Sequence, residues 1–115
     1  MTRLQDVMST SVKTVGPVVS AEQAWSLMQQ HDIHHLVVVD GSEIVGVVSA
    51  RDLGGAKGAA ARKNLTVEDV MVHKPVTAKP EDTLRQAANK LRGYAIGCLP
   101  VVDRGKVKGI VTITD

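Results

Sequence analysis

The chain repeats itself at a fixed interval of 63 residues. The tripeptide Asp-Val-Met at residues 6–8 recurs at residues 69–71, and other short matches recur at the same offset. Laying residues 6–52 on residues 69–115 without a gap gives 15 identities in 47 positions, whereas average composition gives roughly three by chance. Two copies of so short a unit are too few for a solenoid, so the repeat predicts two similar halves related by a pseudo-twofold axis.

The local signals for secondary structure recur together with the residues. The patterns Ser20-x-x-Gln23 and Thr83-x-x-Gln86 are capping boxes, and each opens a segment with apolar residues at helical spacing. That spacing predicts one core-facing stripe per helix. The stripes consist of Ala21, Ala24, Trp25 and Met28 in the first copy and Leu84, Ala87, Ala88 and Leu91 in the second.

Each predicted helix is followed by two β-branched runs, which are separated by turn residues at 40–43 and 103–106 and therefore predict a hairpin. Short extended segments at residues 12–15 and 76–78 precede the helices. A short helix, at residues 4–8 or 67–71, precedes each extended segment. Each copy is thus a β-α-β-β unit.

These elements predict an α+β fold of two β-α-β-β(-α) repeats, each a small mixed sheet packed on helices. Residues 1–64 form the first repeat with a connecting helix, and residues 65–115 form the second. We expect the connecting helix to begin near Asp52 and to be weak in its first turns, because the segment is rich in glycine. The second copy ends without this helix, so we expect a further segment or a partner to cover its sheet.

Composition excludes several classes of function. The 115 residues include no Phe, one Trp and one Tyr, which leaves little on which nucleic-acid bases stack. The net charge of +2 comes from scattered residues, so a nucleic-acid partner is not expected. The single cysteine, Cys98, excludes an intrachain disulfide and fits a reducing cytoplasm. No apolar run approaches the ~20 residues that span a bilayer, so we expect no membrane association.

Three longer motifs indicate a family. The pattern Gly-φ-φ-Ser/Thr-x-x-Asp, in which φ is an aliphatic residue, occupies residues 46–52 and 109–115. The first copy also contains Thr-Val-x-Pro at residues 14–17, and both copies contain a Leu-x-Val-Val-Asp strand, at residues 36–40 and 99–103. Over essentially its whole length the chain resembles a tandem pair of CBS (cystathionine-β-synthase) domains, called a Bateman module.

The resemblance implies a regulatory module rather than an enzyme. Such pairs bind adenosine-containing ligands, such as AMP, ADP, ATP or S-adenosylmethionine, in clefts between the two repeats. They transmit that binding as a signal to an attached or separate effector protein, and they generally form homodimers. The resemblance therefore implies an adenine nucleotide as regulatory ligand, a homodimer, and no required cofactor, metal or catalytic residue.

The resemblance also implies which residues bind the ligand. Asp52 and Asp115 match the carboxylate that accepts hydrogen bonds from the ribose hydroxyls, and Ser49 and Thr112 match the hydroxyl three residues earlier. Arg51 is the best phosphate candidate, with Lys79 and Lys13 behind it. The residues matched to the adenine pockets are Thr14, Val15, His34, His35 and Leu36 in the first copy and Thr77, Ala78, Gly97, Cys98, Leu99 and Pro100 in the second.

Each of these assignments has an alternative. Asp52 and Asp115 also suit helix N-caps, although ligand binding is favoured, and the basic residues equally suit a solvated surface. His31, His34 and His35 straddle a helix end and a strand start, which favours structural positions over a metal site. Cys98 is by default a buried thiol. The alternative function is an interaction or dimerisation module whose clefts hold no ligand.

Overall fold

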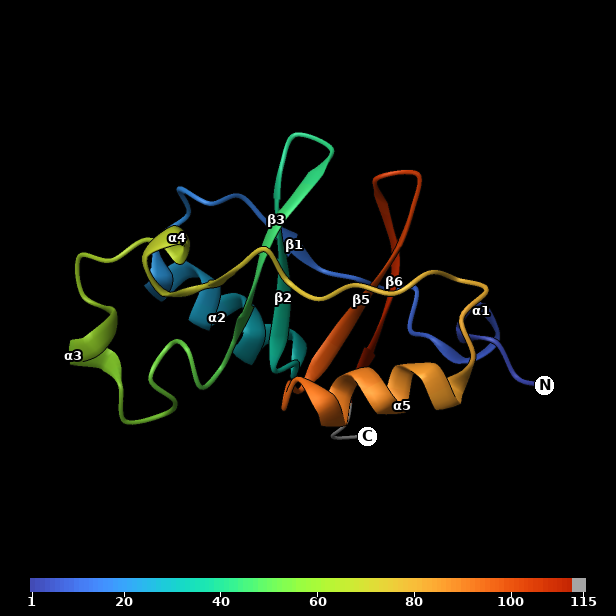
Figure 1. The fold of residues 1–115 in the computed structure, drawn as a ribbon. Helices are drawn as coiled ribbons and strands as arrows, with labels where there is room; N and C mark the ends of the chain where they lie inside the picture. The colour runs from blue at the N-terminus through green and yellow to red at the C-terminus, as the bar shows by residue number, and fades with distance from the viewer. Residues whose placement is uncertain (113–115) are drawn as a thin grey trace. The chain divides into compact units, whose positions relative to one another are not determined.

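The computed structural model describes residues 1–112, and the chain divides into two compact units (Figure 1). One unit, here called the first-repeat unit, is Lys13–Lys74. The other, the second-repeat unit, joins Met1–Val12 to the residues from Pro75 onward. Each unit thus contains the helix and hairpin of one repeat and the entry segment of the other. The boundary predicted between residues 64 and 65 separates the two sequence repeats, so it does not coincide with the boundaries of these units.

A four-stranded mixed sheet forms the centre of the first-repeat unit. Its strands are β1 (Thr14–Val15), β2 (His35–Asp40), β3 (Glu43–Ser49) and β4 (Val72–His73), in the order β1-β2-β3-β4. β1 pairs with β2 in parallel, and the other two pairs are antiparallel. β2 and β3 form the predicted hairpin, whose turn has Gly41 at a φ of +64°.

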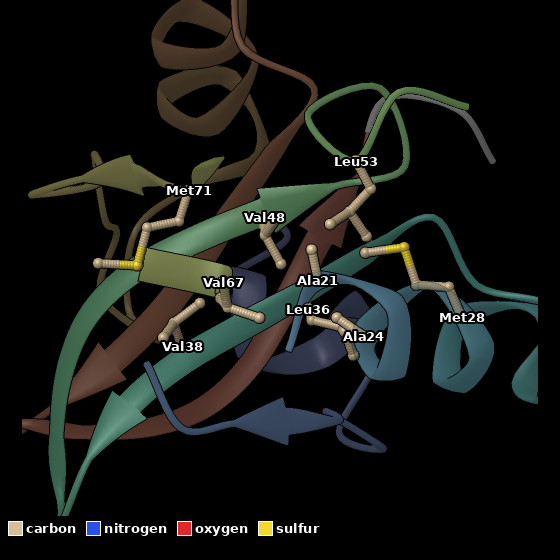
Figure 2. Close-up of a cluster of buried hydrophobic side chains, with 9 residues drawn as sticks. All are labelled: Ala21, Ala24, Met28, Leu36, Val38, Val48, Leu53, Val67 and Met71. Atoms are coloured by element: carbon tan, nitrogen blue, oxygen red, sulfur yellow. The ribbon is translucent and has the colours of Figure 1, made fainter. Parts of the chain in front are cut away.

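The helices of this unit are α2 (Ala21–His31), α3 (Ala59–Arg62) and α4 (Val67–Val70). Apolar side chains from α2, the hairpin and α4 form one buried cluster, because each element has one apolar face that must leave water (Figure 2). Val67 of the second repeat's entry helix is fully buried in this cluster beside Val38 and Leu36 of the first repeat. The members of the cluster are Ala21, Ala24, Met28, Leu36, Val38, Val48, Leu53, Val67 and Met71.

The second-repeat unit has the same arrangement in reduced form. It contains α1 (Leu4–Val7), α5 (Leu84–Gly93) and the hairpin of β5 (Cys98–Asp103) and β6 (Lys106–Thr112). Single bridges replace the outer strands: Ala78 pairs in parallel with Val101, and Ser9 pairs antiparallel with Ile110. The core cluster consists of Leu4, Ala78, Ala87, Leu91, Leu99 and Val101, with Leu4 coming from the first repeat's entry helix. The predicted α+β class is confirmed in both units.

Local hydrogen bonds explain where the helices begin. Thr83 and Gln86 form the full capping box of α5, and Ser20 Oγ accepts a bond of 3.0 Å from the amide of Gln23 at the start of α2. The repeated Asp of the entry segments has the same kind of role. Asp69 accepts bonds from the amide and hydroxyl of Thr66, which lower the pKa of the Asp69 carboxyl.

Two expectations about helices are wrong. The connecting helix does not begin near Asp52, because Gly54 and Gly55 adopt φ values of +90° and +68°, outside the right-handed helical region, and helix begins only at Ala59. The stripe on α5 is also shorter than predicted. Of its four predicted residues, Ala87 and Leu91 are buried, whereas Leu84 and Ala88 are exposed.

The repeated Met and Gly residues contact each other across the repeats. A Cβ added to Gly46 of β3 would lie 2.5 Å from Sδ of Met71, and one added to Gly109 of β6 would lie 2.5 Å from Sδ of Met8. Each methionine follows an entry helix, and each glycine lies in the hairpin of the other repeat. The glycine is therefore required for the entry segment to approach the sheet closely.

The substitution Gly46→Ala should lower the free energy of unfolding by about 1–3 kcal/mol, because Met71 and the carbonyl of Val72 must move to accommodate the methyl group. Chemical denaturation measures this loss. Gly93→Ala is the matched control, since a Cβ there meets nothing within 4 Å and alanine favours the helix. Equal stability of the two variants would contradict the close approach.

Candidate functional site

The predicted ligand-binding residues of the first repeat gather where β2 begins and β3 ends. His35 is paired with Ser49 across the hairpin, and Thr14 of β1 is paired with Val37 of β2. Leu36 is fully buried, whereas His34 is exposed and His35 is half-buried. The small sheet thus brings Thr14, His35 and Ser49 to one end of the unit.

Ser49 and Asp52 close the turn that follows β3. The amide of Ser49 donates to Asp52 Oδ2 at 2.9 Å, and the amide of Asp52 donates to Ser49 Oγ at 3.1 Å. This reciprocal pair resembles a capping box, but the residues that follow are turns rather than a helix. A carboxylate has two oxygens and about four acceptor positions, so the bond from Ser49 leaves Asp52 with capacity to accept further bonds.

Arg62 anchors the loop that follows Asp52. Its Nη1 donates to the carbonyl oxygens of Leu53 at 2.9 Å and Gly55 at 2.8 Å, and only 3% of its side chain is exposed. Nε donates to Glu22 Oε2 at 3.1 Å, and the guanidinium lies 4.4 Å from the centroid of the Trp25 ring. Arg62 therefore fixes the loop to α2 through charge-assisted hydrogen bonds and a cation–π contact.

Arg62 was not predicted from the sequence, because an arginine in an alanine-rich segment is typical of the exposed face of a helix. A signal for it was nevertheless available. Backbone turns satisfy many carbonyls of a glycine-rich loop, but a loop that is not helical leaves some without a backbone donor, so a nearby side-chain donor is needed if the loop is packed. Trp25, predicted to lie on the core-facing stripe, is half-buried beside this guanidinium.

The predicted residues of the second repeat share the corresponding sheet. Cys98 of β5 is paired with Thr112 of β6, and Cys98, Leu99 and Pro100 are buried. The amide of Ala78 donates to the carbonyl of Pro100 at 2.9 Å, which places the Thr77 segment beside β5. Gly97 directly precedes β5. Asp115 lies outside the described residues.

The predicted phosphate candidates of the first repeat are exposed. Arg51 lies in the turn closed by Ser49 and Asp52, and Lys13 directly precedes β1. Within residues 1–112, no group of three or more His, Cys, Asp or Glu side chains could hold a metal ion. No helix in this part of the chain has the length and apolar character that crossing a bilayer requires.

A cavity of about 470 Å³ lies in the second-repeat unit. It includes the predicted residues Thr77 and Ala78, and Lys79, which was a phosphate candidate. The other lining residues were not predicted. The lining consists of Thr77, Ala78, Lys79, Asp82, Lys90, Val102, Arg104 and Gly105.

Comparison with known proteins identifies both repeats. The family model of the CBS domain matches residues 4–56 and 67–115. Inosine-5′-monophosphate dehydrogenase of Korarchaeum cryptofilum is 37% identical over 114 residues, which cover 98% of this chain but 23% of the dehydrogenase. The CBS domain-containing protein YhcV of Bacillus subtilis is 33% identical over 116 residues, which cover 100% of this chain and 83% of YhcV.

Solved structures show the same fold. The CBS domain pair of protein MJ0100, in complex with 5′-methylthioadenosine and S-adenosyl-L-methionine, superposes with a TM-score of 0.88 at 31% identity, covering 97% of this chain and 90% of that one. The protein CBSX2 in complex with AMP superposes with a TM-score of 0.85 at 29% identity, covering 98% and 91%.

Replacing Arg62 by methionine should lower the free energy of unfolding by about 2–4 kcal/mol, because the carbonyls of Leu53 and Gly55 lose their buried donor. Arg51→Met is the matched control, since that side chain is exposed, and it should change stability by less than about 0.5 kcal/mol. Urea denaturation of the two variants measures both values. If Arg62→Met is as stable as Arg51→Met, Arg62 does not anchor the loop.

Proposed function

The chain belongs to the CBS domain family as a tandem pair of CBS domains, and we propose that it is a cytoplasmic regulatory module that binds an adenine nucleotide. The nucleotide, AMP, ADP or ATP, would bind in the cleft between the repeats. Binding would alter the geometry of a homodimer or of an effector protein. The proposed role includes no catalytic step.

The turn of Ser49 and Asp52 carries this proposal. Its two residues belong to the Gly-φ-φ-Ser/Thr-x-x-Asp motif, and their reciprocal hydrogen bonds hold the carboxylate in one orientation before any ligand arrives. Arg62 fixes the loop that follows. Such preorganisation reduces the entropy that ligand binding must overcome, which supports a role for Asp52 as acceptor of the ribose hydroxyls.

Two relatives support the class of ligand. The MJ0100 domain pair was solved with 5′-methylthioadenosine and S-adenosyl-L-methionine, and CBSX2 was solved with AMP. These ligands share an adenosine moiety. We therefore assign Thr14, Val15 and the backbone of residues 34–36 to the adenine, Arg51 to the phosphate, and Ser49 to the ribose or phosphate.

The second repeat would provide a different site. Its residues Gly97 and Cys98 stand where the first repeat has His34 and His35, so the two sites differ in the size and polarity of these side chains. We assign to the second site the residues Thr77, Ala78, Gly97, Cys98, Leu99, Pro100, Thr112 and Asp115.

One observation favours the alternative function, an interaction module without a ligand. On α5, Leu84 and Ala88 are exposed four residues apart, so this helix presents an apolar strip to its surroundings. Such a strip suits a protein partner or a second copy. Response to nucleotide separates the two functions, since a pure interaction module has no reason to respond.

An adenine nucleotide at 100 times its dissociation constant should raise the free energy of unfolding by about 2.7 kcal/mol. Thermal unfolding with AMP, ADP, ATP and S-adenosylmethionine measures this effect, with GTP as the control for the base. A rise in the midpoint with an adenine nucleotide but not with GTP is expected. No shift with any of these compounds would favour the interaction module.

The affinity for the adenine nucleotide, measured by calorimetry, should fall about 10–100-fold in Asp52→Asn, because the ribose hydroxyls lose a charged acceptor. Asparagine caps turns about as well as aspartate, so this variant keeps the bond from Ser49 and stays folded. Asp40→Asn is the control, since Asp40 is exposed at the hairpin turn. If Asp52→Asn binds the nucleotide as tightly as the unmodified chain does, Asp52 does not contact the ligand.

A further inference from the structure

The open cavity of the second-repeat unit is lined by several charged residues. Three of its lining residues, Lys79, Lys90 and Arg104, are cationic, and Asp82 is the one acid among them. Three positive charges and one negative charge leave a formal charge of +2. A cavity of about 470 Å³ lies within the range typical of small-molecule sites.

Lys90 is held with its ammonium at this cavity. Nζ donates to the carbonyl oxygen of Thr77 at 2.8 Å and lies 4.0 Å from Asp82 Oδ2. Asp82 is also tied to the loop, because its Oδ2 accepts a bond of 2.9 Å from the amide of Lys79. An ammonium has three donors, so Lys90 retains donors for a ligand beyond the bond to Thr77.

The first repeat shows that the fold does not require these charges. At an offset of 63 residues, every charged lining residue has a neutral counterpart: Gly16 for Lys79, Val19 for Asp82, Leu27 for Lys90 and Gly41 for Arg104. Leu27 packs against the core of its unit, whereas Lys90 bonds to Thr77. The two repeats share one architecture, so the four charges are specific to the second copy.

Arg104 occupies a position that disfavours it. It lies in the hairpin turn at a φ of +54°, and its counterpart Gly41 has a φ of +64°. A left-handed backbone favours glycine over a residue with a Cβ, so arginine stabilises this turn less than glycine would. Arg104 therefore adds a positive charge to the lining of the cavity but makes the turn less stable.

We propose that this cavity binds a phosphoryl dianion through Lys79, Lys90 and Arg104. The formal charge of +2 matches a phosphate group, which carries about −1.5 to −2 at pH 7, better than a single carboxylate. Arginine adds the planar donor pair that suits phosphate oxygens. The source is either free inorganic phosphate or a phosphate monoester of a small metabolite, whose remaining atoms the cavity has room to hold.

Thr77 and Ala78 border both this cavity and the second proposed nucleotide site, but the residues proposed to bind the ribose lie away from Arg104. The nucleotide residues Cys98 and Thr112 lie at one end of the β5–β6 hairpin, and Arg104 and Gly105 lie at the turn, the other end. Cys98 and Arg104 are six residues apart along β5 and the start of the turn, an extended distance of about 20 Å. The phosphoryl site therefore does not depend on binding of adenine.

Calorimetric titration with inorganic phosphate tests the proposal, with chloride at equal ionic strength as the reference. One phosphate should bind per chain. Lys90→Leu and Arg104→Gly install the first repeat's own residues, and each should weaken binding at least about tenfold. Because glycine suits the turn, Arg104→Gly should keep or increase the stability of the free protein, so its loss of affinity cannot result from unfolding.

Lys108→Gln is the control for nonspecific charge, since Lys108 is exposed on β6 and does not line the cavity. Its affinity should equal that of the unmodified chain. Failure of the unmodified chain to bind phosphate would overturn the proposal, as would equal weakening by all three variants or by none.

Ribose 5-phosphate in the same titration distinguishes the two sources. Tighter binding than that of inorganic phosphate identifies a monoester as the ligand, and weaker binding identifies the free ion. Both probes lack adenine, so a negative result here leaves the nucleotide proposal standing. A negative nucleotide titration likewise leaves the phosphoryl site standing.

Discussion

Burial of each entry helix in the core of the other repeat is the interaction on which both units depend. Leu4 and Val67 occupy equivalent positions 63 residues apart, and both are fully buried. Leu4 joins the cluster around Leu99 and Val101, and Val67 joins the cluster around Leu36 and Val38. Without these side chains each small sheet would expose part of its apolar face, so neither repeat forms its core from its own residues alone.

The same duplication explains how the two units came to differ in chemistry. Once the shared architecture supplies the sheet, the helix and the entry contact, the remaining positions are free to change. In the first-repeat unit, Arg62 binds the loop after β3 and steadies the turn that contains Asp52. In the second-repeat unit, charged residues stand around a cavity at positions where the first repeat has neutral ones. One fold therefore carries two different sets of polar residues.

The positions of the helices and strands can be predicted from the sequence, but the repeat against which each entry helix packs cannot. Capping boxes and β-branched runs are local signals, so the long helices and both hairpins lie where expected. The exchange of entry helices could not be predicted, because Met8 and Met71 are identical and so are Gly46 and Gly109, and either methionine suits either glycine. Within the site, the turn of Ser49 and Asp52 follows from its motif, but the cavity is assembled from positions spread along residues 77–105.

The exchange of entry helices is tested most directly by backbone amide chemical shifts in Leu4→Ala and Val67→Ala. Each variant removes buried apolar atoms, so amides around the new cavity must shift. Leu4→Ala should change shifts mainly in α5 and β5, and Val67→Ala should change them mainly in α2, β2 and β3. Changes confined to each residue's own repeat would contradict the exchange.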